Sequence, residues 1–534
     1  MILSGLETEL PTADICIVGA GPVGLAMALK LESLGMRVLL LEAGPQEGDT
    51  EHAVGPVEFL NDHHATSFAS NRRGLGGSSS RWGGRCVTYD DLDIQPRAHV
   101  PYSGWPISHD AFSRFYPEAL EFLQFQPDRI DLPNLVADDP EVGAESIERW
   151  SKNPYLGDLH RQHLRHSQRI IVLTSATVSN ILLTADGKTD CLEISCQGKL
   201  IEIRAGAFVL AGGGLENARL LLGLQARSPG RFGSGALGRF YQGHLTGYIA
   251  VVEFSQAEFA EALSFQRTAK GYVFRRRLQI SPEVQIREKL LNTVFWIDPI
   301  SIADPVHGSG ALSLLYLLSF VSGLYGLLAN GLAPRSRSQS SLDRRKHFEN
   351  FLSDRRSAPD LVRLLTRSIH CRAERQRMLT NPRGRYLLRY HAEQMPDPDS
   401  RVTMNGPSRA LSVDYRVRKE DLDSVLNSHS MLDVWLRRNR LGKLEYLHSE
   451  SERRQAVLNQ AFDGYHQIGL TRMSENPDEG VLDADCRVHG ILNLYVAGSC
   501  VFPTGGHANP TLPAVALALR LAEHLGKIQK TKSA

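Results

Sequence analysis

The sequence predicts an α/β protein with two domains, one of parallel strands and helices and one of antiparallel sheet and helices. Three observations support this prediction. An apolar strand runs into a glycine-rich turn at 14–24, a strand, glycine turn and helix follow at 207–222, and another glycine turn precedes an apolar helix at 511–525. We expect a discontinuous first domain and a second domain from the rest of the chain, divided as 1–110, 168–245 and 463–534 against 111–167 and 246–462.

The composition is that of a globular protein large enough for more than one core. The chain has 534 residues, and its 60 basic residues nearly balance 59 acidic ones, which argues against a general nucleic-acid binder. Its seven cysteines are scattered without a Cys-x-x-Cys pair, as is typical of thiols in a reducing compartment. Because the first ten residues lack the basic region of a secretory signal, we expect a cytoplasmic protein whose first core strand begins at Asp14.

The glycine-rich turn near the N-terminus predicts a Rossmann-like, dinucleotide-binding unit. Gly19 permits the tight turn, Gly21 lets the backbone approach a pyrophosphate, and Gly24 allows close packing of the following helix. Glu42 ends the second strand, where an acid can accept hydrogen bonds from the ribose hydroxyls. The same glycine spacing occurs by chance in purely structural turns. Its place between a strand and a helix that leads to a second strand favours dinucleotide binding over a structural turn.

A glycine–serine loop at 73–85 favours FAD over NAD as the dinucleotide. The loop is too long for a plain turn, and Gly76, Gly77 and Ser78 suit a backbone that lies close to a flat ring and its phosphates. A flexible linker is the alternative, but it fits poorly with Trp82 inside the loop. We therefore expect these residues to contact FAD.

Two more cofactor contacts are expected further along the first domain. Strands predicted at 169–173, 191–195 and 200–203 lead towards the turn at Gly212, which can approach the same dinucleotide a second time. Val178 lies shortly after the first of these strands and is the other expected contact.

Two polar residues near the C-terminus are candidates for catalysis. His466 opens the pattern His-x-x-Gly-x-x-Arg-Met, and Asn509 directly precedes the apolar helix. A neutral imidazole can accept a proton near pH 7, and an amide can donate a hydrogen bond without competing for that proton. The simpler interpretations are a loop histidine with satisfied hydrogen bonds and an asparagine that caps the helix, although a cap can also serve the site. Expected cofactor contacts in this part of the chain are Gly498, Ser499, Asn509, Pro510 and Thr511.

These motifs together resemble those of the glucose-methanol-choline (GMC) oxidoreductases, in the branch of pyranose 2-oxidase and related sugar or alcohol dehydrogenases. The matching pieces lie at 17–44, 73–85, 103–107, 209–222, 237–239 with His244, and 462–525. The resemblance implies an FAD enzyme that oxidises a hydroxyl group of a sugar, glycoside or other alcohol to a carbonyl. His466 falls at the position of the base that takes the hydroxyl proton while hydride passes to flavin N5, and Asn509 falls at that of the residue that holds the substrate oxygen.

Two residues depart from the family pattern. Leu470 stands where relatives usually have a small hydroxyl residue, and Arg81 stands where pyranose 2-oxidase has its flavin-linking histidine. We therefore expect FAD to be bound non-covalently. Two alternatives to alcohol oxidation stay open, a non-redox lyase on the same scaffold and a dinucleotide-binding partner protein without turnover.

The expected substrate side is less well defined. His507 is a candidate substrate contact or a structural residue, and Gln394, beside Glu393 on a predicted return strand, is a candidate for the pocket wall. Residues 246–390 carry little recognisable pattern, as suits a domain that varies with the substrate. The identity of the alcohol is therefore open, and the electron acceptor stays open between oxygen, a quinone and a partner protein.

One apolar stretch raises the question of membrane contact. Residues 311–333 contain no charged side chain, and 335–377 hold 12 Arg/Lys against 5 Asp/Glu, a net charge of 12 − 5 = +7. We rank a buried or pocket-capping segment first, peripheral membrane contact through 311–377 second, and a membrane span last. A single amphipathic helix is predicted over 418–450, and the Lys-rich tail at 527–534 is expected to fray.

Overall fold

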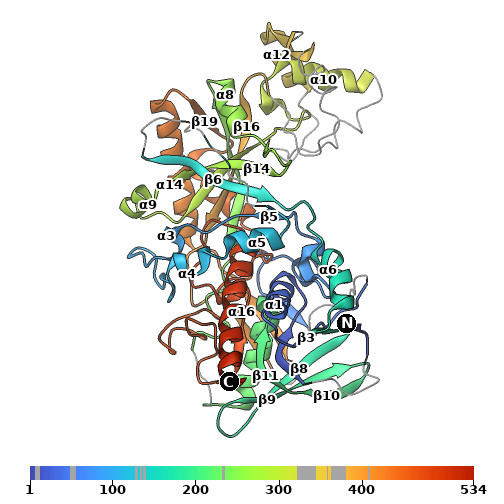
Figure 1. Cartoon of the computed structure of the whole chain (residues 1–534). Coiled ribbons are helices and arrows are strands. Elements are labelled where there is room, and N and C mark those ends of the chain that lie inside the picture. The colour runs from blue at the N-terminus through green and yellow to red at the C-terminus, as the bar shows by residue number, and fades with distance from the viewer. Residues whose placement is uncertain are drawn as a thin grey trace.

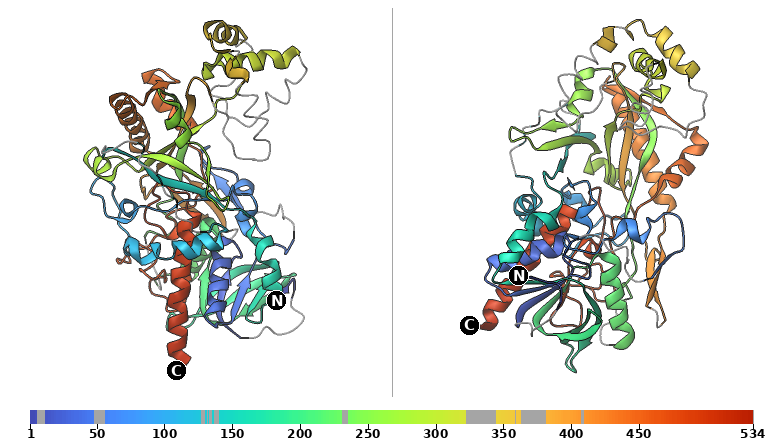
Figure 2. Two further views of the ribbon diagram at one scale, coloured as in Figure 1. Left: turned by 45° about the horizontal axis from the view of Figure 1, so that its top comes forward. Right: turned by 90° about the vertical axis from the view of Figure 1, so that its right-hand side faces the viewer.

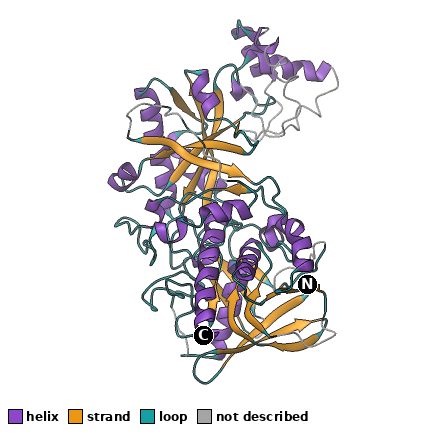
Figure 3. Ribbon diagram, viewed as in Figure 1, coloured by secondary structure: helices purple, strands orange, loops and turns teal. Residues whose placement is uncertain are grey.

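The computed structural model describes the chain except residues 6–11, 48–55, 127–129, 131, 133–134, 136–139, 231–234, 322–343, 358, 363–380, 407–408 and 534. The molecule is elongated, with one α/β part that contains both termini and a second sheet-rich part at the opposite end (Figures 1 and 2). Figure 3 shows helices and strands mixed in both parts, which confirms the predicted fold class.

The α/β part is built on a six-stranded parallel sheet of order β1-β7-β3-β2-β11-β20. The strands are β1 (Ile2–Leu3), β2 (Ala13–Val18), β3 (Val38–Leu41), β7 (Ile170–Leu173), β11 (Ala205–Leu210) and β20 (Leu494–Val496). Apart from the partly buried edge strand β1, their apolar runs are buried on both faces, as parallel strands require. Strands from three distant stretches of the chain complete one sheet, which makes this part discontinuous in sequence.

Two helices from opposite ends of the chain pack together beside this sheet. These are α1 (Pro22–Ser33) and α16 (Thr511–Ser533). A Cβ on Gly24 would lie 1.9 Å from the carbonyl oxygen of Gly19, so glycine is required where α1 approaches the turn. The tail from 527 is helical as far as Ser533, so its expected fraying stays a prediction.

Smaller elements surround the parallel sheet. An antiparallel sheet consists of β8 (Ala176–Leu183), β9 (Thr189–Cys196) and β10 (Lys199–Ile203), and helix α7 (Gly214–Arg227) follows β11. The remaining short elements are α2 (Ser67–Ser70), η1 (Gly77–Ser80), α3 (Asp91–Ile94), α4 (His109–Ser113), α5 (Tyr116–Phe122), α6 (Leu156–His166) and η3 (Ser499–Val501).

The second part is built on an antiparallel sheet of order β19-β12-β16-β15-β14-β6-β5, with β13 beside β14. Its strands are β5 (Arg85–Cys86), β6 (Val142–Trp150), β12 (His244–Phe254), β13 (Gln266–Arg267), β14 (Val273–Ile280), β15 (Thr293–Asp298), β16 (Arg385–Glu393) and β19 (Gly442–Tyr446). One face packs in an apolar core with the helices α8 (Ala257–Ala262), α14 (Lys419–Arg438) and α15 (Glu450–Gln460). A short helix, α9 (Pro282–Arg287), connects β14 to β15.

One sequence expectation fails at a secondary-structure boundary. The helix predicted over 418–450 ends at Arg438, because the turn that follows places Arg440 at φ 55° and Gly442 at φ 159°, and β19 then pairs with β12. The first core strand is β2, which begins at Ala13, one residue before the expected Asp14, and the short β1 before it is only partly buried at the edge of the sheet. The error in the helix concerns an edge strand, whose pairing partner is distant in sequence.

The predicted division at 1–110 is crossed by two strand pairings. Strand β4 (Val57–Phe59) pairs with β18 (Ala410–Asp414), which also pairs with β17 (Arg401–Asn405), and β5 joins the antiparallel sheet. The domain bounds therefore stay a prediction.

A small helical subdomain lies at the far end of the second part (Figure 1). Its helix α10 (Gly310–Val321) packs on α12 (Arg344–Ser353), near the short η2 (Pro305–His307). Ala311 and Leu312 are buried there, but the rest of the apolar stretch, 322–333, and much of 335–377 lie outside the described residues. Among the residues that the structure describes, no helix is both long and apolar enough to cross a membrane.

Candidate active site

A cavity lies at the carboxyl ends of the parallel strands, where the glycine turns meet. Most of the predicted cofactor contacts border it: Gly19, Gly21, Glu42, Gly77, Ser78, Val178, Gly212, Gly498, Ser499, Pro510 and Thr511. A Cβ on Gly21 would meet no protein atom within 4 Å, so the space above the start of α1 is open. Glycine turns and helix N-termini that face such a space suit the pyrophosphate of a dinucleotide.

Glu42 borders the cavity but already bonds to the protein. Its carboxylate accepts hydrogen bonds from the backbone N–H groups of Ala20 (2.9 Å), Gly44 (2.8 Å) and Gly74 (2.9 Å). Burial raises the pKa of Glu42, and these three hydrogen bonds oppose the rise. A carboxylate offers about four acceptor positions, so one is left for a ribose hydroxyl. Glu42 therefore also joins the glycine turn to the loop at 73–85.

Four predicted cofactor contacts do not border the cavity. Gly24 and Gly76 act through packing, since a Cβ on Gly76 would lie 2.6 Å from the backbone nitrogen of Gly157. Trp82 donates its indole N–H to the carbonyl oxygen of Pro154 at 2.7 Å. Asn509 lies directly before Pro510 and Thr511, and its side chain turns towards His466.

The two predicted catalytic residues are in direct contact. The side-chain nitrogen of Asn509 lies 3.1 Å from Nε2 of His466, and His466 itself borders the cavity. Because an amide N–H can only donate, Nε2 of His466 must carry a lone pair, and the ring proton must be on Nδ1. The histidine is thus held with its accepting nitrogen towards Asn509.

Asp463 holds the other side of the His466 ring. Its Oδ2 lies 3.0 Å from Nδ1 of His466 and accepts the backbone N–H of His244 at 2.7 Å. Its Oδ1 accepts the backbone N–H groups of Tyr465 and His466 at 2.9 and 3.2 Å, which shapes the loop. Burial would raise the pKa of Asp463, but attraction to His466 and hydrogen bonds from both histidines hold it well below its usual value. The carboxylate is therefore ionised beside the candidate base.

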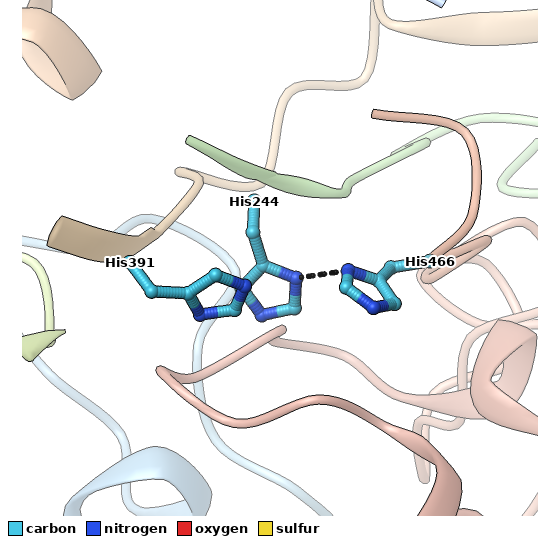
Figure 4. Close-up of side chains that lie close together, drawn as sticks. All are labelled: His244, His391 and His466. Atoms are coloured by element: carbon cyan, nitrogen blue, oxygen red, sulfur yellow. Dashed lines mark hydrogen bonds between the residues drawn. The ribbon is translucent and has the colours of Figure 1, made fainter. Parts of the chain in front are cut away.

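Two further imidazoles lie beside His466 (Figure 4). Nδ1 of His244 lies 3.0 Å from Nδ1 of His466, and the His244 ring stacks on that of His391 with centroids 4.3 Å apart. Burial lowers the pKa of both His244 and His391, so these rings are neutral. The three histidines have nitrogen atoms within 4.8 Å of one another, an arrangement that could hold a metal ion. The hydrogen bonds of His466 to Asp463 and Asn509 explain its position without one.

The structure places both predicted substrate-side residues inside protein hydrogen-bond networks. His507 is fully buried, with Nε2 at 2.8 Å from Oδ2 of Asp90 and Nδ1 at 3.1 Å from Nη2 of Arg277. The side-chain oxygen of Gln394 accepts hydrogen bonds from the backbone N–H of Gly243 and the hydroxyl of Tyr415, both at 2.8 Å. Both side chains are bonded in ways that suit structural roles, so we do not assign them to the substrate.

Sequence reasoning missed several residues of the site. Asp463 could have been found from the sequence, because an aspartate often accepts hydrogen bonds from the backbone N–H groups two and three residues ahead. Here it accepts those of Tyr465 and His466 and so shapes the loop that carries His466. Residues 71–73, Glu216 and Tyr465 also border the cavity, but no pattern marked them individually. The contact of His244 with His466 joins residues far apart in the sequence and had no local signal.

The structure combines an α/β part and a sheet-rich part with a cavity lined by glycine turns, and His466, Asn509 and Asp463 lie at the edge of this cavity. Residues 396–518 match the family model described as GMC oxidoreductase, for the C-terminal domain. Residues 396–518 are therefore similar to the GMC oxidoreductases, the family predicted from the motifs, whose members are FAD-binding flavoproteins.

Two curated relatives match short stretches of the chain. A 2-methyl-1,2-propanediol dehydrogenase from Mycolicibacterium austroafricanum is 26% identical over 135 residues, which cover 21% of this chain and 24% of that protein. A C-glycoside 3-oxidase from Arthrobacter globiformis is 46% identical over 63 residues, 12% of each chain. The matched stretches thus span a quarter or less of these relatives.

Solved structures match the fold over nearly the whole chain. Pyridoxine 4-oxidase from Mesorbium loti has a TM-score of 0.51 and 15% identity, over 96% of this chain and 99% of that one. A formate oxidase has a TM-score of 0.53 and 16% identity, over 98% and 100%. At this identity the likeness establishes the fold.

Proposed function

We propose that this protein is an FAD-dependent oxidoreductase that converts a hydroxyl group of a sugar, glycoside or other alcohol to a carbonyl. The observation that carries the proposal is the contact between His466 and Asn509 at the edge of the dinucleotide cavity. The two curated relatives are a dehydrogenase of a diol and an oxidase of a C-glycoside, which supports the same class of chemistry. The pyranose 2-oxidase-like branch stays a prediction.

The cavity residues fit FAD as the cofactor, bound without a covalent link. The glycine turns at Gly19, Gly212 and Gly498 would hold the dinucleotide, and Glu42 has one acceptor position left for a ribose hydroxyl. When bound, FAD would supply the two-electron oxidant for the alcohol. The N-terminus of α16 borders the cavity, and its positive end favours negative charge that develops there.

His466, Asn509 and Asp463 would together remove the proton of the substrate hydroxyl. Nε2 of His466 accepts the proton as the hydride leaves the same carbon, so the alcohol loses two electrons and two hydrogens and becomes a carbonyl. The Asn509 amide, which bonds to Nε2 of His466 in this structure, would donate instead to the substrate oxygen once the substrate hydroxyl takes its place at Nε2. Asp463 keeps the ring proton on Nδ1 and stabilises the imidazolium that forms, which a buried carboxylate 3.0 Å away is suited to do.

Anaerobic flavin bleaching tests the function directly. A panel of alcohols, sugars and glycosides is mixed with the FAD-loaded protein without oxygen, and the flavin absorbance is followed. We expect at least one alcohol to bleach the flavin and to yield one carbonyl product per flavin. Bound FAD that no alcohol in a broad panel reduces would favour the partner-protein alternative, and turnover without bleaching would favour the lyase alternative.

The electron acceptor and the location of the protein each have more than one candidate. Oxygen, a quinone and a partner protein remain the candidate acceptors, and reoxidation of the bleached flavin by each one distinguishes them. We keep a cytoplasmic location, with peripheral membrane contact through 311–377 as the second candidate. Flotation with anionic liposomes tests that contact, because a protein that stays at the bottom of the gradient has no such contact.

A further inference from the structure

One face of the antiparallel sheet carries a cluster of arginines close to the catalytic pair. Side chains alternate along a strand, so Arg389 lies on the same face of β16 as His391, about 7 Å away along the strand. Arg389 pairs in register with Trp296 of β15, and Arg275 of β14 pairs with Glu148 of β6. The opposite face belongs to the apolar core, so these polar groups share the face that carries the active-site histidines.

Trp296 lies at the centre of three guanidinium groups. Its ring centroid is 4.9 Å from the guanidinium carbon of Arg85, 5.2 Å from that of Arg275 and 5.9 Å from that of Arg389. The rings of His466 and His391 are 5.9 Å apart, and those of His391 and Trp296 are 6.2 Å apart. Trp296 is therefore at most 5.9 + 6.2 = 12.1 Å from His466. We name Arg85, Arg275, Trp296 and Arg389 the arginine cluster.

The arginine cluster has more positive charge than its acidic partners neutralise. Glu148 is shared by Arg85 and Arg275, and Asp298 by Arg275 and Arg389, so the local charge is 3 − 2 = +1. Burial lowers the pKa of Arg85 and repulsion from Arg275 and Arg389 adds to this, while Glu148 opposes both.

Exposure divides the cluster into a buried layer and an accessible layer. The side chains of Glu148 and Arg275 are 0% and 1% exposed, whereas those of Arg85 and Arg389 are 28% and 35% exposed. The buried ion pair of Glu148 and Arg275 therefore has a structural role. The groups that solvent reaches are mainly guanidiniums, and Tyr248, which bonds to Arg389 at 2.9 Å, adds a hydroxyl.

We propose that Arg85 and Arg389 bind an anionic group, a carboxylate or a phosphate, on the alcohol substrate. Planar guanidiniums match the oxygen atoms of both groups, and an excess of positive charge beside an aromatic ring favours such a ligand. The inference rests on the proposed function, and it sets the substrate class as a hydroxy acid or a phosphorylated alcohol. The guanidinium carbons of Arg85 and Arg389 lie at most 12.1 + 4.9 = 17.0 Å and 12.1 + 5.9 = 18.0 Å from the His466 ring, so the anionic group and the hydroxyl to be oxidised would lie at opposite ends of one substrate molecule.

Binding of simple anions tests the arginine cluster without turnover. Malonate and inorganic phosphate are titrated into the FAD-loaded protein at constant ionic strength, by calorimetry and by the visible difference spectrum of the flavin. We expect saturable binding of at least one anion, and an affinity at least about 10-fold lower in Arg389→Gln. The preferred anion distinguishes a carboxylate from a phosphate substrate.

The matched control is Arg385→Gln on the same strand. Arg385 forms ion pairs with Glu253 and Glu445 and is not part of the cluster, so its substitution should leave anion affinity unchanged. No saturable binding of either anion, or an equal loss in both variants, would overturn the proposal. Because anion binding does not depend on flavin reduction, this outcome is separate from a failure of the proposed oxidation.

The same assignment predicts a preference among substrates. Methyl β-D-glucuronide and methyl β-D-glucoside 6-phosphate should bind at least about 10-fold more tightly than methyl β-D-glucoside, and Arg389→Gln should reduce this ratio. Equal affinity of the three glycosides would contradict the assignment, whichever of them bleaches the flavin.

Discussion

Oδ2 of Asp463 lies 3.0 Å from Nδ1 of His466, while Nε2 of the same ring accepts a hydrogen bond from Asn509. The carboxylate and the amide therefore fix both the orientation and the tautomer of one imidazole. A substrate hydroxyl would replace the Asn509 amide at the single lone pair of Nε2, and the fixed tautomer of the ring is the basis of the predictions on catalysis.

Replacement of His466 with Ala should leave FAD bound and slow anaerobic flavin reduction by about 100-fold or more, because the proton acceptor is lost. Stopped-flow absorbance gives the rate, and the flavin content per chain is the control. A variant that reduces its flavin at nearly the wild-type rate would show that another group is the base.

Asp463→Asn should slow flavin reduction by about 100-fold to 10,000-fold, because the ring loses both its fixed tautomer and its negative partner. The acid limb of the pH–rate profile should also move to lower pH, since the protonated ring is no longer stabilised. Rates measured from pH 5 to 9 test both effects.

Asp421→Asn is the matched control for that variant. Asp421 is also fully buried and accepts the backbone N–H groups of Met395 and Arg418, both at 2.8 Å, but it has no contact with His466 among the described residues. It should alter stability without a shift of the pH–rate profile. The role of Asp463 would be merely structural if both variants lost stability and kept the wild-type profile.

Asp463 should also contribute to the pH dependence of stability. Its pKa is depressed in the folded protein, so its contribution is present above the unfolded value and is lost as pH falls through the folded value. The melting temperature of wild type should therefore fall more steeply below about pH 4 than that of Asp463→Asn. Parallel curves for the two proteins would contradict the depressed pKa.

Two glycine substitutions in one turn should have different effects. Gly21→Ala adds a methyl group that meets only open space, so the apoprotein should keep its stability while FAD binding weakens by at least about 10-fold. Gly24→Ala places the methyl group against the carbonyl oxygen of Gly19 and should destabilise the apoprotein by about 1–3 kcal/mol. Thermal unfolding and FAD titration separate the two effects. If Gly21→Ala binds FAD normally, the cavity above this glycine does not hold the pyrophosphate.

The mode of flavin attachment has a direct test. The resemblance to pyranose 2-oxidase implies a flavin-linking histidine at the position of Arg81, which cannot form that bond, so acid precipitation should release the yellow chromophore into the supernatant. A flavin that remains in the pellet would mean that it is covalently attached at another residue.

The sequence by itself determined the parts of this protein that depend on local chemistry. The glycines at 19, 21 and 24 are required by a tight turn and a close helix approach, and such requirements can be recognised within a few residues. The pattern around His466 and the asparagine before Pro510 likewise predicted two candidate catalytic residues that the structure brings into contact.

Tertiary structure alone decided which distant groups surround that pair. His244 and His391 come from two strands of the antiparallel sheet, and the arginine cluster draws on four strands, so their contacts follow from strand register rather than from spacing in the chain. Tertiary contacts also decide where α14 ends, at Arg438, and which groups bond to the Gln394 side chain, namely the backbone N–H of Gly243 and the hydroxyl of Tyr415. Pairing across a sheet joins residues hundreds of positions apart, and a local pattern contains no information on which partners a strand will meet.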